Sequence, residues 1–239
     1  MEGIIHSIES LAAVDGEGLR CCVFFAGCPL RCAYCHNPDT WKMEGTRITP
    51  ETLVKKIARF KTYFGENGGV TFSGGEPLLH AEFLCETVPL LKREQIPYIL
   101  DTSGQVLLSE SVMFLLKEAQ GVLLDLKFWD DDSYRTYTGV GIQRTLDMLH
   151  ALNEIGTKTV LRTVIIPEVN DTKEHIAAYL DLFRGISCVS RYELLSFHTM
   201  GFFKYEKLGI KNPFAGKSAL SAEKRIELQE FADLKRKNG

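Results

Sequence analysis

Three closely spaced cysteines carry the clearest chemical signal in this chain. The pattern C-x-x-x-C-x-x-C is formed by Cys28, Cys32 and Cys35, and it follows an apolar run that ends at Phe25. A cubane iron–sulfur cluster is held by four ligands, so three thiolates leave one iron open to bind another molecule. The spacing therefore predicts a [4Fe-4S] cluster with an open iron, in which the three cysteines are metal ligands and part of the catalytic centre.

Two other kinds of metal site stay open on the sequence. The same cysteines with His36 could bind zinc, although zinc modules usually bring paired ligands from two separated segments and no second C-x-x-C follows. An ordinary ferredoxin would need a fourth cysteine. Cys85 and Cys188 stand singly in apolar or helical segments, where a buried free thiol is the usual outcome. We favour the three-cysteine cluster over both alternatives.

The composition is that of an ordinary globular protein, with 45% hydrophobic and 25% charged residues. A length of 239 residues allows one sizeable core, so we expect a single domain over residues 1–239. The net charge of −3 gives no electrostatic case for nucleic acid. We expect no membrane span and no signal peptide, because no apolar stretch approaches about 18 residues and the start lacks a basic segment. Seven cysteines without disulfide-like spacing favour a reducing cytoplasm.

Apolar runs alternate with amphipathic segments along the chain, which predicts strands that alternate with helices. The predicted strands are Arg20–Phe25, Gly69–Phe72, Tyr98–Asp101, Val122–Leu126, Thr159–Ile166 and Arg191–Leu195. The first helix begins after a threonine cap at Thr49 and carries Leu53, Ile57, Phe60 and Phe64 on one face. Further helices are predicted over Ala81–Arg93, Glu110–Ala119, Ile142–Ile155, Lys173–Phe183 and Ala222–Lys237.

This alternation fits either a parallel barrel or an open doubly wound sheet, and the positions of the polar side chains decide between the two. They lie inside the predicted strands or just past their C-terminal ends, at Glu76, Asp101, Asp125, Lys127, Arg162 and His198. Side chains from successive strands converge on one site at the C-terminal mouth of a barrel, whereas a doubly wound sheet gathers its ligand loops at one switch point. Six strands are too few to close a barrel. We therefore predict an α/β fold, a partial, open (β/α)6 TIM-like barrel of parallel strands.

The chain around the cysteines carries a longer motif that reads from Gly16 through Asn37 and continues to Trp41. In residue types and spacing this segment resembles the glycyl-radical activase signature. The chain is thus similar to the radical S-adenosylmethionine (SAM) superfamily and, within it, to the pyruvate formate-lyase activating enzymes. One position departs from the pattern, since Glu17 stands where the family usually has proline, between two glycines that still permit a tight turn.

The resemblance implies that SAM chelates the open iron through its amino and carboxylate groups. Tyr34 matches an aromatic position that packs near the adenine, where a tyrosine could otherwise serve only loop packing. The segment Ser73–Pro77 resembles the family's SAM-binding GGE motif, with Gly74 and Gly75 opening the backbone to the ligand and Glu76 able to accept from the SAM ammonium. A tight turn between strand and helix is the alternative interpretation of this segment.

Acidic and basic residues on the later strands are implied to contact the rest of SAM. Asp101, Asp125 and Lys127 match positions near its carboxylate and ribose, although Asp125 and Lys127 share one strand face and could form only a salt bridge. The two aspartates are also implied to hold a monovalent cation. Arg162 lies in an apolar strand, where burial is costly without an anionic partner.

Two further positions on the last strands match the family pattern. Val164 lies on the strand that runs under the ligand, and His198 lies near the adenosine. A lone histidine is otherwise more often a structural residue, but the motif continues after His198 as Thr199–Gly201.

The implied activity is reductive cleavage of SAM and removal of the α-hydrogen from a glycine of pyruvate formate-lyase. Flavodoxin or ferredoxin is the implied electron donor, and the enzyme is expected to be a monomer. Asp15 and His36 match positions near the substrate's glycine loop. The cluster loop, residues 26–41, is followed by only seven residues before Thr49, too few for a second ferredoxin-like cluster insert. The remaining alternatives are an activase of another glycyl-radical enzyme, a radical SAM enzyme with a small-molecule substrate, and a non-enzymatic zinc module.

Overall fold

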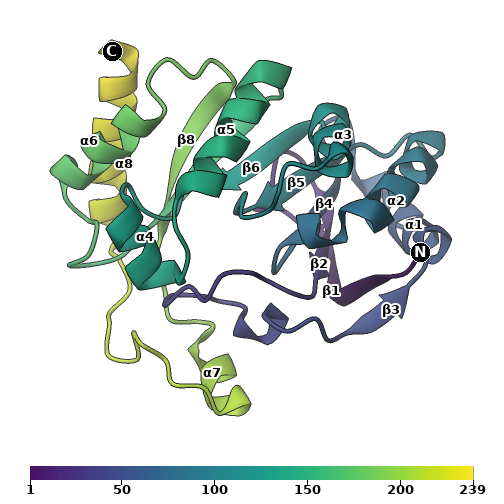
Figure 1. The fold of residues 1–239 in the computed structure, drawn as a ribbon, viewed down its shortest axis with the longest axis horizontal. Helices are drawn as coiled ribbons and strands as arrows, with labels where there is room; N and C mark the ends of the chain where they lie inside the picture. The colour runs from purple at the N-terminus through teal and green to yellow at the C-terminus, as the bar shows by residue number, and fades with distance from the viewer. Residues whose placement is uncertain (239) are drawn as a thin grey trace.

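A single, mostly parallel sheet organises the chain. The computed structural model describes residues 1–238, and within them eight strands follow the order β3-β1-β2-β4-β5-β6-β7-β8. From β2 onward every pairing is parallel. The six parallel strands are β2 (Arg20–Phe25), β4 (Gly69–Gly74), β5 (Tyr98–Thr102), β6 (Gly121–Asp125), β7 (Thr159–Ile165) and β8 (Val189–Ser196). They confirm the six predicted strands and the α/β class with an open sheet (Figure 1).

Two strands that the sequence did not predict extend the sheet at one edge. β1 (Gly3–Ala12) pairs antiparallel with both β2 and β3 (Thr46–Ile48). β1 is mostly half-buried or exposed, so its sequence lacks the continuous apolar run of a strand covered on both faces. β3 is three residues long. The prediction of six strands was therefore right for the parallel part and missed this antiparallel edge.

The helices lie where amphipathic segments were predicted, with small shifts at their ends. They are α1 (Pro50–Ala58), α2 (Ala81–Arg93), α3 (Glu110–Glu118), α5 (Gln143–Ile155), α6 (Lys173–Leu182) and α8 (Ala222–Asn238). The Thr49 hydroxyl accepts from the backbone N–H of Thr52, which confirms the predicted cap. α1 ends at Ala58, so Phe60 and Phe64 do not belong to its face as predicted. The sequence analysis also missed α4 (Asp131–Thr138), α7 (Phe202–Leu208) and the short 3-10 helices Pro38–Thr40, Lys61–Tyr63 and Pro77–His80.

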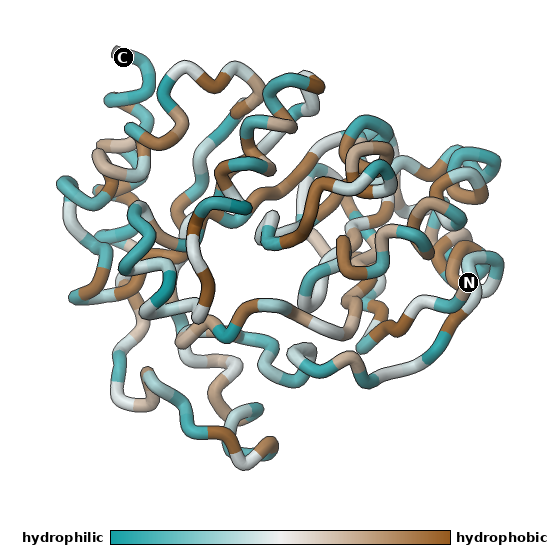
Figure 2. The backbone as a smooth tube through the Cα atoms, viewed as in Figure 1, coloured by the Kyte–Doolittle hydropathy of each residue, from teal (hydrophilic) through white to brown (hydrophobic). Residues whose placement is uncertain are grey.

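The main core lies between the sheet and the helices. Figure 2 shows hydrophobic residues along the central strands, and these strands contribute fully buried side chains such as Phe72, Leu100 and Leu124 to one large cluster. A second, small cluster of Ile99, Leu123 and Val160 alternates with that set, so it lies on the opposite face of the sheet.

The chain leading out of β1 crosses this second face. A Cβ atom at Gly16 would lie 2.3 Å from the side chain of Ile99, and the φ angle of Gly16 is +123°. Glycine is therefore required where the chain passes over the small cluster. Glu17, the departure from the family pattern, turns outward to an ion pair with Lys158 (2.9 Å).

Helix α8 closes the other end of the sheet. The Gln229 amide accepts from the backbone N–H of Leu194 and donates to the carbonyl of Tyr192. These contacts occupy backbone groups on the outer edge of β8, which would otherwise be open to pairing. Among the described residues, no helix is long and apolar enough to cross a membrane.

A buried arginine fixes the loop that precedes β2. The Arg20 guanidinium, 1% exposed, donates to the Thr71 hydroxyl (2.8 Å) and to the carbonyls of Glu17, Asn67 and Val70 (3.0, 3.1 and 2.9 Å). Burial lowers the pKa of Arg20 to about 10. This one side chain therefore joins the loop over the second face to the start of β4.

We predict that Arg20→Met costs about 3 kcal/mol of unfolding free energy, because several buried acceptors lose their donor at once. Urea denaturation of the variant measures this loss. Arg47→Met is the matched control, since the Arg47 side chain is 69% exposed on β3, and it should change stability by less than about 0.5 kcal/mol. Equal stability of the two variants would contradict the role given to Arg20.

Candidate active site

Nearly all residues predicted for the site line one cavity at the C-terminal ends of the parallel strands. The cavity holds about 260 Å³. The predicted residues that line it are Asp15, Cys28, Cys32, Tyr34, Cys35, His36, Gly74, Gly75, Asp101, Asp125, Lys127, Arg162 and Val164. They come from positions as far apart as residues 15 and 164, so the fold gathers them as the barrel argument predicted. Two predicted residues lie elsewhere, Glu76 behind the cavity and His198 beside it.

Backbone hydrogen bonds hold the cluster loop around the cavity. Gly27 and Cys28 donate to the carbonyls of Thr40 and Trp41 (2.8 and 3.2 Å), which closes the loop on itself. Within the loop, the backbone N–H of Arg31 donates to the carbonyl of Thr138 at the end of α4. The unpredicted helix α4 therefore supports the cysteine segment from outside.

The three thiols fit a cluster better than a single metal ion. All three are free, and burial raises the pKa of Cys28 and Cys32 to about 12. Within residues 1–238 no three His, Cys, Asp or Glu side chains are arranged to hold one metal ion. A zinc site needs its ligands around one point, whereas thiolates of a cubane bind separate irons. The donor set and its spread around one cavity thus fit a [4Fe-4S] cluster.

The glycine pair after β4 brings that strand end against the cysteine segment. A Cβ atom at Gly74 would lie 2.3 Å from the backbone nitrogen of Phe25, and one at Gly75 would lie 2.1 Å from the carbonyl oxygen of Gly27. In return, the backbone N–H groups of Gly75 and Glu76 donate to the carbonyls of Phe25 and Gly27 (2.9 and 2.8 Å). The two glycines are required for this close approach.

Glu76 has a different place from the one predicted. Its carboxylate is fully buried and accepts from the hydroxyl of Thr102 (2.6 Å), from the N–H and hydroxyl of Ser103 (2.9 and 2.6 Å), and from the N–H of Leu78 (3.2 Å). Both oxygens are thus occupied by the chain itself. In this structure Glu76 locks the glycine turn to the end of β5, rather than presenting its carboxylate to an ammonium group in the cavity.

Arg162 joins the acidic residues of the site. It lies opposite Asp125 in the β6–β7 register, and its guanidinium donates to Asp101 and makes two hydrogen bonds to Asp125 Oδ1 (2.8 and 3.0 Å). Lys127 donates to the other oxygen of Asp125 (2.6 Å), and Ser73 donates to Asp101 (2.7 Å). The expected anionic partners of Arg162 are therefore present, and the Asp125–Lys127 salt bridge raised as an alternative does form.

The pKa values of Asp101 and Asp125 are shifted in opposite directions. Burial opposes ionisation of both, but Arg162 and Lys127 outweigh it at Asp125 and hold its pKa down at about 2. At Asp101 burial prevails over Arg162 and the pKa is raised. The guanidinium of Arg162 lies next to both carboxylates, in the place where a monovalent cation was expected.

Two aromatic positions of the site lack partners for their polar atoms. The Tyr34 hydroxyl and His198 Nδ1 are buried and have no hydrogen-bond partner within residues 1–238. Buried polar groups are nearly always paired, so such orphans indicate a place for a ligand. The rings of His36 and His198 stack at 3.8 Å, and His36 Nε2 donates to the His198 carbonyl (2.9 Å). Burial lowers the pKa of both histidines, which favours their neutral form.

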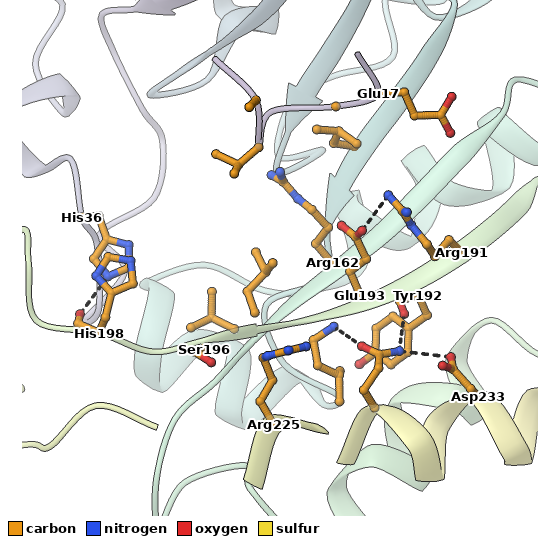
Figure 3. Close-up of a pocket in the computed structure, with 18 residues that line it drawn as sticks. Glu17, His36, Arg162, Arg191, Tyr192, Glu193, Ser196, His198, Arg225 and Asp233 are labelled. Atoms are coloured by element: carbon orange, nitrogen blue, oxygen red, sulfur yellow. Dashed lines mark hydrogen bonds and ion pairs between the residues drawn. The ribbon is translucent and has the colours of Figure 1, made fainter. Parts of the chain in front are cut away.

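A larger hollow of about 920 Å³ adjoins the cavity. His36, Arg162, Val164 and Leu195 line both, so the two spaces meet there. Figure 3 shows the stacked histidines at one side of the hollow, with Arg162 and Glu193 reaching in from β7 and β8. Helix α8 closes the far side with Arg225, Gln229 and Asp233. Glu193, Arg225, Gln229 and Asp233 were not predicted from the sequence, because they belong to no motif and lie on an edge strand or a polar helix.

Comparisons with known proteins agree with this site. Residues 22–180 match the profile of the Radical SAM superfamily. A pyruvate formate-lyase-activating enzyme of Clostridium pasteurianum is 46% identical over 231 residues, which cover 96% of each chain. One from Streptococcus mutans is 37% identical and covers 90% of this chain and 84% of its own. The chain belongs to the radical SAM superfamily, in the family of pyruvate formate-lyase-activating enzymes.

Solved structures share the radical SAM fold with this chain. A domain of a pyruvate-formate lyase-activating enzyme from Bacteroides vulgatus superposes with a TM-score of 0.57 at 23% identity, over 70% of this chain and 93% of that one. Streptococcus suis SuiB bound to its precursor peptide superposes with a TM-score of 0.58 at 18% identity, over 70% and 36%. Membership in the superfamily implies a [4Fe-4S] cluster and SAM as cofactors, and the cysteines that such a cluster needs are in place.

Proposed function

We propose that this chain reductively cleaves SAM and removes the α-hydrogen of one glycine in pyruvate formate-lyase, leaving a glycyl radical on that partner. The identity of 46% to a curated activating enzyme over 96% of the chain supports this function. The observation that carries it is the meeting of the three cysteines with a balanced set of charged side chains in one cavity. When bound, the cluster supplies the electron that splits SAM into methionine and a 5′-deoxyadenosyl radical, which takes the glycine hydrogen.

The chain's own residues bind and orient the reactants in this proposal. Cys28, Cys32 and Cys35 hold three irons. Asp101 and Asp125 balance Arg162 and Lys127, so the cavity carries both signs of charge, as the ammonium and carboxylate of the methionine part of SAM require. The backbone of Gly74 and Gly75 lies open at the strand end, and the unpartnered Tyr34 hydroxyl and His198 Nδ1 are free to bind polar atoms of the nucleoside. Val164 provides an apolar floor.

The larger hollow is the proposed entrance for the glycine loop of the partner. It is wide, it opens beside β8, and it meets the cluster cavity at His36 and Arg162. Asp15 lines the cluster cavity between Val14 and Gly16, which line the hollow, and burial raises the pKa of Asp15 while Arg162 opposes the rise. We assign Asp15 and His36 to positioning the backbone of that loop.

The chain is proposed to work as one domain and as a monomer in the reducing cytoplasm, with flavodoxin or ferredoxin as electron donor. One sheet and one main core span the described residues, which supports a single domain. The cluster loop passes through β3 directly into α1, which leaves no room for an inserted cluster domain.

The proposal predicts peptide-dependent formation of 5′-deoxyadenosine. The iron-reconstituted protein is incubated without oxygen with SAM, dithionite and a peptide that carries the glycyl loop of pyruvate formate-lyase. We expect product to rise at least about tenfold over the peptide-free reaction, because the hydrogen donor completes the reaction only when positioned. The control peptide replaces the glycine with α-aminoisobutyrate, which has no α-hydrogen, and it should give no rise. Product that ignores the peptide would point instead to a small-molecule substrate.

A further inference from the structure

The outer side of the cluster loop carries an arginine stacked over a tryptophan. The guanidinium of Arg31 lies 5.2 Å from the ring centre of Trp41. Arg31 is exposed, and within the described part of the chain no carboxylate pairs with it. Its guanidinium also donates to the carbonyls of Cys28 and Leu30 (2.8 and 2.7 Å). A free positive charge is therefore fixed directly on the segment that holds the cysteines.

Trp41 reaches from this surface to a cluster ligand. It lines the cluster cavity, and its carbonyl accepts from the N–H of Cys28. The indole shares this cavity with the Cys35 thiol, whose sulfur accepts from the backbone N–H of Asn37 (3.4 Å). On its other side Trp41 meets the edge of Tyr205, whose hydroxyl donates to the Cys35 carbonyl (3.0 Å). Trp41 thus lines the cavity together with Cys35 and is hydrogen-bonded through its carbonyl to Cys28.

Two exposed residues, Lys42 and Met43, directly follow Trp41 in the chain, and Leu79 lies beside Met43. Met43 and Leu79 are 46% and 43% exposed, and both lie within 3.4 Å of the position that a Cβ atom of Gly27 would occupy. Lys42 is exposed and only loosely paired with Glu44 (3.9 Å). Exposed apolar groups ringed by charges are typical of a surface that binds another protein. We call Arg31, Trp41, Lys42, Met43 and Leu79 the Trp41 surface.

The Trp41 surface is separate from the proposed entrance for the glycine loop. None of its residues is among those that line the larger hollow in the part of the chain described by the structure. A protein bound there would leave the hollow free for a second partner. The two partners that the proposed function requires, an electron donor and a hydrogen donor, could then bind at once.

We propose that the Trp41 surface docks a one-electron donor protein with an acidic rim around its redox centre, and that Trp41 is the contact through which the electron enters. This rests on the proposed function, which requires an electron for each SAM cleaved. The donor loses one electron and the bound cluster gains it, and no bond forms or breaks. Electron tunnelling falls steeply with distance, so a route through a side chain that lines the cavity together with the ligand cysteines is favoured. The positive charge of Arg31 selects an acidic partner.

The test measures how fast the cluster is reduced, not the activity of the enzyme. Cluster-loaded protein is mixed in a stopped-flow instrument with reduced flavodoxin, an acidic one-electron donor, and the bleaching of the cluster absorbance is followed. We expect Arg31→Gln to lower the second-order rate constant about 5- to 10-fold at low salt and to weaken its dependence on salt. The rate with dithionite, a small reductant that needs no docking surface, should stay unchanged. Arg184→Gln, which removes an exposed arginine at the end of α6, is the matched control and should behave as the unmodified chain.

A second variant examines the contact itself. Trp41→Phe keeps an aromatic ring at the proposed contact and Trp41→Ala removes it, so reduction by flavodoxin should slow more in Trp41→Ala than in Trp41→Phe. The docking proposal would be overturned if flavodoxin reduced the cluster at the same rate in Arg31→Gln and Arg184→Gln. It would also be overturned if Arg31→Gln slowed reduction by flavodoxin and by dithionite equally. Failure of the proposed function looks different. It would leave the flavodoxin rates sensitive to Arg31 but give no peptide-dependent 5′-deoxyadenosine with dithionite.

Discussion

A Cys32→Ala variant of this chain should form no 5′-deoxyadenosine above background. Cys32 is buried in the cluster cavity between Cys28 and Cys35, and its loss leaves two thiolates for a cluster that needs three from the protein. The loss in rate should exceed about 10³-fold, because disturbing only the outer partners of a metal ligand already costs about 10–100-fold. The assay measures product formed with SAM and dithionite, and the iron content of the reconstituted protein is determined alongside.

Two controls separate the ligand role from a general effect of losing a thiol. Cys85→Ala removes a partly buried cysteine whose thiol donates to the Ser111 carbonyl (3.6 Å) and does not line the cluster cavity, so it should keep both iron content and activity. The double variant Cys32→Ala/Cys35→Ala should be no worse than the single one, since residues that act as a unit are not additive. Substantial activity in Cys32→Ala with a full iron content would contradict the assignment of the cluster.

The parallel part of the fold could be predicted because its strands are buried on both faces. β4, for example, consists of buried residues up to Ser73, and such a run is visible in the sequence without any knowledge of its neighbours. β1 could not be found in this way, because much of its length is half-buried or exposed and it is a strand only through its pairing with β2 and β3. α4 buries Tyr134 and Thr138 and otherwise consists mostly of polar residues, so its role as the support of the cluster loop depends on a contact distant in sequence.

The sequence predicted which residues form the site, but it did not predict which of them contact one another. Polar residues at the ends of buried parallel strands converge for geometric reasons, so their positions in the sequence suffice to predict that Asp101, Asp125 and Arg162 share one site. The sequence could not show that Glu76 would be satisfied by Thr102 and Ser103, because that depends on how far the β4 turn reaches toward β5. Trp41 was known only as the end of a motif, and its backbone hydrogen bond with Cys28 follows from the closing of the loop.

Arg162→Met should destabilise the chain by about 3–5 kcal/mol, the cost of removing one partner from a buried ion pair. Arg162 is 9% exposed and bridges Asp101 and Asp125, so methionine would leave two neighbouring carboxylates with one cation, Lys127, on Asp125 alone. Urea denaturation of the protein prepared without iron measures this. Arg191→Met on the next strand removes a half-exposed arginine paired with Glu193 and should cost less than about 1 kcal/mol.

The pH dependence of the stability lost in Arg162→Met identifies the carboxylate that is responsible for the loss. Burial already raises the pKa of Asp101 against the opposing charge of Arg162, so removing Arg162 should raise it further. A carboxyl whose folded pKa exceeds its unfolded pKa of about 3.9 stabilises the fold fully only below that value, and the stabilisation is lost as pH rises through the folded pKa. The deficit of Arg162→Met should therefore be larger near about pH 8 than near about pH 5. Adding Asp101→Asn to the variant should recover part of the loss at the higher pH, since the uncompensated charge is then gone, and a double variant as unstable as the sum of its parts would contradict this account.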